Sequence, residues 1–209
     1  MIEVKTYKVG KLKTNCYLIT DPVTKRGVII DPGGEIPDFT KEVSLFKIDY
    51  ILLTHGHFDH ILNANKYKKL TQSKIVISKL DSEFTSNNNL NLSRKFLRPN
   101  TFEQFKPDIL INDNDTITFS DTKITVLATP GHTQGSVCYM LGNYIFSGDT
   151  LFFRDHGYTK FPTGSSPDME KSLNRLYTLK GDYIVYPGHS KITLLSEERN
   201  NSTGLKKQV

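Results

Sequence analysis

The most informative segment of the sequence is HGHFDH, residues 55–60, which directly follows the apolar run Tyr50–Thr54. A short continuous apolar run of this kind predicts a strand that is buried on both faces. His55 and His57 alternate on an extended segment, so both imidazoles can face the same side. We expect Gly56 between them to permit an unusual backbone bend.

Asp59 and His60 complete the stretch and would begin the next helix, where unsatisfied backbone amides favour a carboxylate. Three further residues of ligand type, His132, Asp149 and His189, each come directly after a strand-like run and a glycine. Five of the six histidines of the chain therefore lie at strand ends. A single histidine is commonly an ordinary core or surface residue, but this combination predicts a metal site.

The remaining pattern predicts a layered α/β domain in which strands outnumber helices. Strands are expected at 2–8, 15–20, 28–31, 50–54, 75–78, 116–119, 123–129, 136–141, 144–147 and 183–186. Helices are expected at 37–46, from 59 to about 70, and at 168–179 with Ser166 or Asp168 as the cap. Gly142-Asn143 predicts a two-residue hairpin turn. Residues 81–107, here called the excursion, predict one or two short helices, and the polar tail after Leu195 is expected to fray.

These segments resemble the metallo-β-lactamase superfamily from about residue 15 to 200. They follow its order: Asp31 after a strand, the HGHFDH block, His132, Asp149 and His189. The resemblance implies a four-layer αβ/βα sandwich of two mixed β-sheets flanked by helices, in a single domain over residues 1–209. It also implies a two-metal site along one edge of the sheets.

The resemblance assigns the ligands residue by residue. One metal would be held by His55, His57 and His132, and the second by Asp59, His60 and His189. Asp149 would bridge the two ions, while Asp31 would be a structural partner and not a ligand. A nitrogen and oxygen donor set suits two divalent ions, with zinc the first expectation and iron or manganese the alternatives.

Three motifs, Asn15–Tyr17, Thr129–Ser136 and Gly148–Phe152, resemble the small glyoxalase II-like branch, which hydrolyses thioesters such as hydroxyacyl-glutathiones. The resemblance implies a hydrolase in which a metal-bridging hydroxide attacks an acyl carbonyl, with Asp59 and Asp149 as the catalytic carboxylates. Two alternatives stay open: a hydrolase of lactones or other esters, and an oxidoreductase similar to mono-iron persulfide dioxygenases.

Two departures from that branch bear on the substrate. Only 20 residues follow His189, so we expect no C-terminal glutathione-binding helical domain. Where small members of the branch read Gly-Arg-Thr-Asp, this chain has Tyr158 in the arginine position and Lys160 in the aspartate position. Tyr158, Lys160 and the nearby loop residue His156 are the candidate substrate contacts. We expect a small acyl or thioester substrate with poor discrimination for glutathione.

The composition narrows the class of protein further. The net charge is +5, but the lysines are scattered and no zinc-finger spacing or arginine-rich stripe occurs, so no nucleic-acid partner is expected. No apolar run is long enough to span a membrane. The two cysteines, Cys16 and Cys138, are too few for a disulfide scaffold, and we expect a cytoplasmic protein. The sequence leaves the oligomeric state open.

Overall fold

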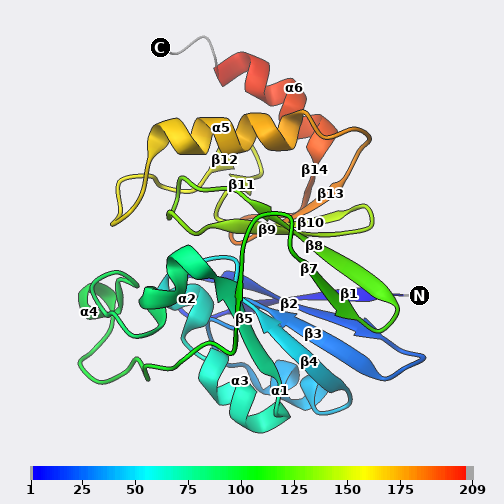
Figure 1. The fold of residues 1–209 in the computed structure, drawn as a ribbon, viewed down its shortest axis with the longest axis vertical. Coiled ribbons are helices and arrows are strands. Elements are labelled where there is room, and N and C mark those ends of the chain that lie inside the picture. The colour runs from blue at the N-terminus through cyan, green and yellow to red at the C-terminus, as the bar shows by residue number, and fades with distance from the viewer. Residues whose placement is uncertain (1, 206–209) are drawn as a thin grey trace.

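The computed structural model describes residues 2–205, which form two six-stranded mixed sheets with helices on their outer faces (Figure 1). The first sheet contains, in spatial order, β1 (Glu3–Val9), β2 (Thr14–Asp21), β3 (Arg26–Ile30), β4 (Lys47–Leu52), β5 (Lys74–Ser78) and β6 (Ile109–Ile111). The second contains β14 (Thr193–Leu194), β13 (Ile184–Pro187), β10 (Tyr144–Gly148), β9 (Val137–Leu141), β8 (Thr122–Ala128) and β7 (Thr116–Phe119). A small ribbon pairs β11 (Leu151–Phe152) with β12 (Asp155–His156).

Both sheets mix antiparallel and parallel pairs. In the first sheet β1, β2 and β3 are antiparallel neighbours, whereas β3 to β6 run parallel. In the second sheet only β10 and β13 are parallel. The register Tyr144 to Leu141 confirms the predicted hairpin turn at Gly142-Asn143.

Side-chain alternation along the central strands explains why both faces of each sheet are buried. In β2, Tyr17 and Ile19 belong to the apolar layer between the sheets, whereas Cys16 and Leu18 face the helices that cover the first sheet. A third apolar layer, which includes Leu176, fills the space between the second sheet and its helices. Three apolar layers therefore separate helices, sheet, sheet and helices, and the predicted four-layer sandwich is confirmed.

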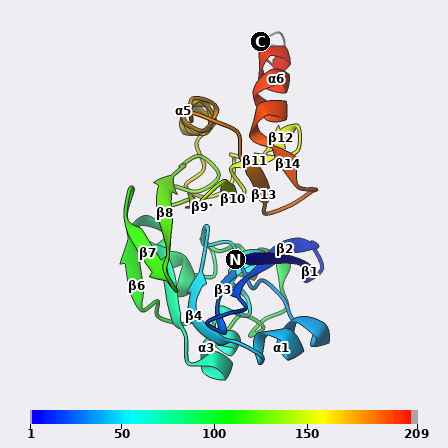
Figure 2. The same ribbon diagram turned by 90° about the vertical axis from the view of Figure 1, so that its right-hand side faces the viewer.

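The longer helices cover the two outer faces, as Figure 2 shows from the side. The helical segments are α1 (Pro37–Val43), α2 (Phe58–Ile61), α3 (Ala64–Thr71), the 3-10 segment η1 (Lys79–Thr85), α4 (Ser93–Phe96), α5 (Ser166–Tyr177) and α6 (Leu195–Leu205). The cap of α5 is Ser165, whose hydroxyl accepts from the Asp168 amide at 3.3 Å, and neither Ser166 nor Asp168 has that role. No helix among residues 2–205 is long and apolar enough to cross a membrane.

The tail after Leu195 does not fray over its described part, so that expectation is wrong as far as residue 205. It forms α6, because specific polar contacts compensate for its few apolar side chains. Glu198 is 2% exposed, and its carboxylate accepts from Thr193 Oγ1 at 2.6 Å and from the Arg154 amide at 2.9 Å. The Arg199 guanidinium donates to the carbonyls of residues 177, 179 and 181 at the end of α5 and just beyond it. Residues 206–209 lie outside the described part.

Candidate metal centre

The residues of ligand type meet at one edge of the sandwich, where four strands from both sheets end. Residues 55–60 follow β4, His132 follows β8, Asp149 follows β10, and His189 follows β13. The potential ligand atoms form three overlapping groups, with the atoms of each group within 4.8 Å of one another. The groups are His55 with His57 and His132, His55 with His60 and Asp149, and Asp59 with His60 and His189. The structure thus brings together all seven residues that the sequence nominates.

The first cluster consists of three buried imidazoles. The rings of His55, His57 and His132 lie edge to face, with centroids 4.6–4.9 Å apart. His57 Nδ1 lies 2.8 Å from His132 Nε2. His132 Nδ1 donates to the Tyr158 carbonyl at 2.6 Å, so its Nε2 lone pair is directed into the cluster. This arrangement is suited to holding one metal ion.

The second cluster surrounds the Asp59 carboxylate. Asp59 Oδ2 lies 3.2 Å from His189 Nε2 and 3.5 Å from His60 Nε2, and it also accepts from Thr14 Oγ1 at 2.9 Å. His60 Nδ1 donates to Asp31 Oδ2 at 2.8 Å, which turns His60 Nε2 toward the cluster. These atoms are suited to holding a second ion.

Asp149 lies between the two clusters. Its Oδ2 is 3.4 Å from His132 Nε2 in the first cluster and 3.6 Å from His189 Nε2 in the second. Its Oδ1 is 3.3 Å from His60 Nε2. One carboxylate therefore faces ligand atoms of both clusters, as a bridging ligand requires.

Several of the potential donor atoms are buried without a hydrogen-bond partner, which also fits a metal site. Within the described part of the chain these atoms are His55 Nε2, His60 Nε2 and Asp149 Oδ1; three further buried atoms also lack a partner, one of them His57 Nε2, whose ring faces the cluster with Nδ1. An unpaired buried polar atom costs about 1–3 kcal/mol. A Cβ on Gly188 would lie 2.2 Å from Asp149 Oδ1, so only glycine leaves that oxygen free. Imidazole nitrogen and carboxylate oxygen are the donors that zinc prefers.

The electrostatics of the site favour the ligand forms of His55, His57 and Asp149, whereas the carboxylates around His60 raise the pKa of that imidazole despite its burial. Burial lowers the pKa of His57 to about 3 and that of His55 well below its ordinary value, so both imidazoles are neutral and can coordinate. Burial alone would raise the pKa of Asp149, but His60 and His132 hold it well below the ordinary value. The carboxyl is therefore ionised.

Asp31 has the structural role that the resemblance implies. Its carboxylate accepts from the Thr54 amide at 2.8 Å and from the Thr54 hydroxyl at 2.6 Å, in addition to His60. These bonds fix the end of β4 and orient the His60 ring. Asp31 belongs to none of the three groups of potential ligands.

The motif Asn15–Tyr17 holds the segment that carries His189. The Asn15 amide donates to the Gly188 carbonyl at 2.7 Å, and Asn15 Nδ2 donates to the Pro187 carbonyl at 2.7 Å. The Tyr17 hydroxyl donates to the same Pro187 carbonyl at 2.5 Å. The motif therefore positions a ligand from the opposite sheet.

The expected backbone bend at Gly56 is wrong. Gly56 is not among the glycines with a positive φ, and its requirement is steric. A Cβ at this position would lie 2.2 Å from the Cβ of Phe84, so the excursion packs directly on the backbone between His55 and His57. Glycine is needed for close approach, not for conformational freedom.

Sequence reasoning missed Asp81, which connects the two loops of the first cluster. Asp81 is fully buried, and its carboxylate accepts from the Gly56 amide at 2.9 Å, from the Thr133 hydroxyl at 2.7 Å and from the Gly135 amide at 2.8 Å. Burial raises the pKa of Asp81 to about 6 although all three donors act to lower it. Gly56 lies between His55 and His57, and Thr133 follows the third ligand. One feature of the sequence could have indicated Asp81: it lies three residues after β5, close to another strand end.

We expect Asp81→Asn to weaken metal binding at the first cluster by about 10–100-fold, the size of effect known for outer residues that orient metal ligands, because Asp81 holds the residues next to the ligands. The NH2 group of the asparagine cannot accept a hydrogen bond, so one of the three donors that now contact Asp81 would lose its partner. The loop that carries this donor would then be held less firmly. Competition with a chromophoric chelator measures the affinity. Asp21→Asn is the matched control, because Asp21 also accepts from several donors, but in the β2–β3 hairpin. Equal affinity in the two variants would contradict this role.

The three candidate substrate contacts, Tyr158, Lys160 and His156, lie in different surroundings. Tyr158 is 55% exposed and its ring packs on Phe161 at 4.8 Å between centroids, while the Phe161 ring lies 5.5 Å from that of His57. Lys160 and Phe161 line a cavity of about 360 Å³ whose other wall is the excursion. His156 is exposed on β12, and its Nδ1 donates to the adjacent Gly157 carbonyl.

The comparisons with known proteins agree with this geometry. The family model of the metallo-beta-lactamase superfamily matches residues 9–189. The probable polyketide biosynthesis zinc-dependent hydrolase PksB of Bacillus subtilis (strain 168) is 30% identical over 195 residues, covering 88% of this chain and 80% of that protein. The hydroxyacylglutathione hydrolase GloC of Haemophilus influenzae is 28% identical over 207 residues, covering 96% of this chain and 97% of GloC.

A solved structure supports the same assignment. The crystal structure of the B3 metallo-beta-lactamase BLEG-1 superposes with a TM-score of 0.87 at 28% identity, covering 95% of this chain and 97% of that chain. The family match includes all seven residues of the two clusters. This chain belongs to the metallo-beta-lactamase superfamily.

Proposed function

We propose that this protein is a binuclear metal-dependent hydrolase that cleaves thioesters to a carboxylic acid and a thiol. The observation that carries the proposal is the position of Asp149, whose carboxylate faces histidines of both clusters at 3.3–3.6 Å. The similarity to a zinc-dependent hydrolase and to a hydroxyacylglutathione hydrolase supports the reaction class.

In this proposal His55, His57 and His132 hold one ion, and Asp59, His60 and His189 hold the other, with Asp149 between them. A pair of divalent ions supplies a hydroxide nucleophile at neutral pH and polarises the acyl carbonyl. We propose zinc as the metal, because histidine nitrogens dominate the donor set; iron and manganese accept the same donors.

The two carboxylates of the centre have separate tasks. The contacts of Asp59 to Thr14, His60 and His189 are all made by Oδ2. We propose that Oδ1 accepts a hydrogen bond from the attacking oxygen and orients it toward the carbonyl carbon. Asp149 is buried and ionised, and its charge keeps the two clusters at their spacing.

The substrate pocket is expected to discriminate poorly for glutathione, which carries two carboxylates. The Tyr158 side chain cannot make the bidentate contact of an arginine, and its phenol packs on Phe161. We predict that lactoylglutathione is hydrolysed at most about tenfold better than a simple neutral thioester, the factor for 1.4 kcal/mol of differential transition-state binding. The measurement is kcat/KM for both substrates on one preparation.

A wider panel separates the reaction classes. The panel adds a lactone, a β-lactam, and a glutathione persulfide assayed by oxygen consumption. Thioesters are expected to be the preferred substrates, with no oxygen uptake. A thousandfold preference for lactoylglutathione would contradict the predicted poor discrimination for glutathione. Faster hydrolysis of the lactone, or oxygen uptake with the persulfide, would contradict the thioesterase assignment.

We further propose a small-molecule substrate and a reducing compartment such as the cytoplasm. Cys16 and Cys138 are buried free thiols. Burial raises the pKa of Cys138 to about 11, so this thiol is unreactive at neutral pH. Their burial supports packing roles for both cysteines and gives neither a part in the reaction.

A further inference from the structure

We propose that a groove beside Asp59 binds an extended apolar arm of the substrate that ends in an anionic group, a carboxylate or a phosphate, with Arg98 and Lys11 as the anion-binding residues. This inference rests on the proposed thioester hydrolysis for the reaction, and it adds the class of substrate. We call this cavity the Asp59 groove.

The Asp59 groove has the size and the lining of a small-molecule site. Its volume is about 700 Å³, and Asp59 of the metal centre is one of its lining residues. The walls come from the β1–β2 turn, the loop after β3, α2 with the residues after it, and the excursion. Leu12 and Phe96 both line the groove and are 54% and 52% exposed, and the Phe96 ring stacks on Phe58 with centroids 5.8 Å apart. Large exposed apolar side chains at a cavity mark a binding surface.

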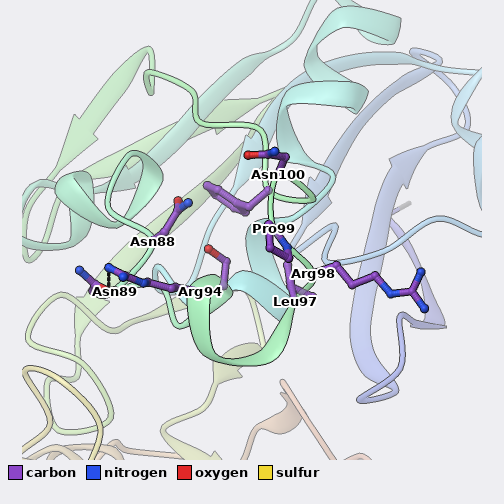
Figure 3. A pocket seen from close by; sticks show the side chains of 9 residues that line it. Asn88, Asn89, Arg94, Leu97, Arg98, Pro99 and Asn100 are labelled. Atoms are coloured by element: carbon purple, nitrogen blue, oxygen red, sulfur yellow. Dashed lines mark hydrogen bonds between the residues drawn. The ribbon is translucent and has the colours of Figure 1, made fainter.

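The lining of the groove carries two basic side chains, Lys11 and Arg98, and two acidic ones, Glu35 and Asp59. Glu35 lines it but is paired with Lys66. Lys11 and Arg98 also line it, and neither forms an ion pair with any side chain that the structure describes. Figure 3 shows the Arg98 side chain extending away from Arg94 and toward the N-terminal strands. Two cations therefore remain free to meet an anionic ligand.

The polarity of the groove fixes the direction of the bound arm. The thioester must reach the metal centre, to which Asp59 belongs, whereas Arg98 and Lys11 attract a carboxylate or phosphate. The uncharged thioester therefore lies toward Asp59, and the charged end lies at the two cations. Arginine forms paired hydrogen bonds with both anionic groups, and lysine adds a point charge.

Two other cavities lie along the excursion, and one of them shares Leu97 and Arg98 with the Asp59 groove. The cavity shown in Figure 3, of about 400 Å³, is lined only by excursion residues 88–102 and does not include a ligand of either cluster. Lys160 lies in a further cavity together with Arg94. Arg94 and Arg98 have the same charge and both line the cavity of Figure 3, but only Arg98 also lines the Asp59 groove, so they form a matched pair for experiment.

The test uses the metal-loaded protein and thioethers that resemble the substrate but cannot be hydrolysed. The probes are 8-(methylthio)octanoate, 8-(methylthio)octyl phosphate and 8-(methylthio)octanol, with affinities measured by isothermal titration calorimetry. We expect at least one anionic probe to bind about tenfold or more tightly than the alcohol, the size of one charge-assisted contact. The stronger of the two anions identifies the terminal group. Equal binding of all three probes would overturn the proposal.

Variants locate the anion site. Arg98→Ala and Lys11→Ala should each reduce the anion preference several-fold, Arg98→Lys should retain part of it, and Arg94→Ala should leave it unchanged. Leu12→Glu, an exposed substitution, should weaken all three probes and the anions most. An unchanged preference in Arg98→Ala, or an equal loss in Arg94→Ala, would overturn the assignment. Because binding needs no turnover, these results are independent of whether the protein hydrolyses thioesters.

Discussion

Asp149→Ala is expected to abolish hydrolase activity and to reduce the metal content from about two ions per chain to at most one. Asp149 faces histidines of both clusters, and its removal takes away the negative charge that the two clusters share. Loss of one transition-state donor alone costs about 10²–10³ in kcat. Loss of a bridging ligand should cost at least about a thousandfold.

The matched control for this variant is His156→Ala. His156 lies on β12, beyond Asp149 in the chain, but it is exposed and its ring hydrogen-bonds to the adjacent Gly157 carbonyl. Its removal should leave the metal content unchanged. Elemental analysis of both variants, together with steady-state kinetics of Asp149→Ala, makes the comparison. An Asp149→Ala protein with two ions and parental activity would contradict the bridging role, and metal loss in His156→Ala would show that the sixth histidine is a ligand.

The second large effect is expected on thermal stability. Metal binding pairs buried atoms such as His55 Nε2 and Asp149 Oδ1, which have no hydrogen-bond partner otherwise. At a free zinc concentration about a thousand times the Kd, binding to the native state alone stabilises it by about 4 kcal/mol. For a chain of this size that corresponds to a rise in Tm of about 8–16 °C.

Calorimetry of chelator-treated protein, with and without added zinc, measures this shift. Magnesium at the same concentration is the control, because this hard cation prefers oxygen ligands and should bind the histidine-rich centre poorly. A shift below about 2 °C with zinc, less than 1 kcal/mol for a domain of this size, would contradict a preformed site. An equal shift with both cations would show that the effect does not come from the histidines.

The sequence predicted the parts of the fold that depend on local periodicity. Runs with apolar side chains on both faces, such as Val28–Asp31 and Tyr50–Thr54, correspond to β3 and β4 within a few residues. The structure also brings together the residues of ligand type, because ends of neighbouring strands meet at one edge. The short strands β6 and β14 were not predicted, since three and two residues give no recognisable pattern.

The features that were missed depend on contacts between distant segments. Asp81 is 25 residues from Gly56 and 54 from Gly135, so no local pattern reveals its hydrogen bonds. The packing of Phe84 on Gly56 has the same origin. The helix α6 forms because the buried Glu198 finds partners in other segments, whereas its own sequence is polar.

The number of metal ions per chain tests directly whether the seven residues hold two ions at one centre. Freshly prepared protein, saturated with zinc, iron or manganese in separate experiments and freed of excess ions, should contain about two ions per chain by elemental analysis. Calorimetric titration of the chelator-treated protein should give the same number. One ion per chain under saturating conditions with every metal would contradict the binuclear centre and the mechanism built on it.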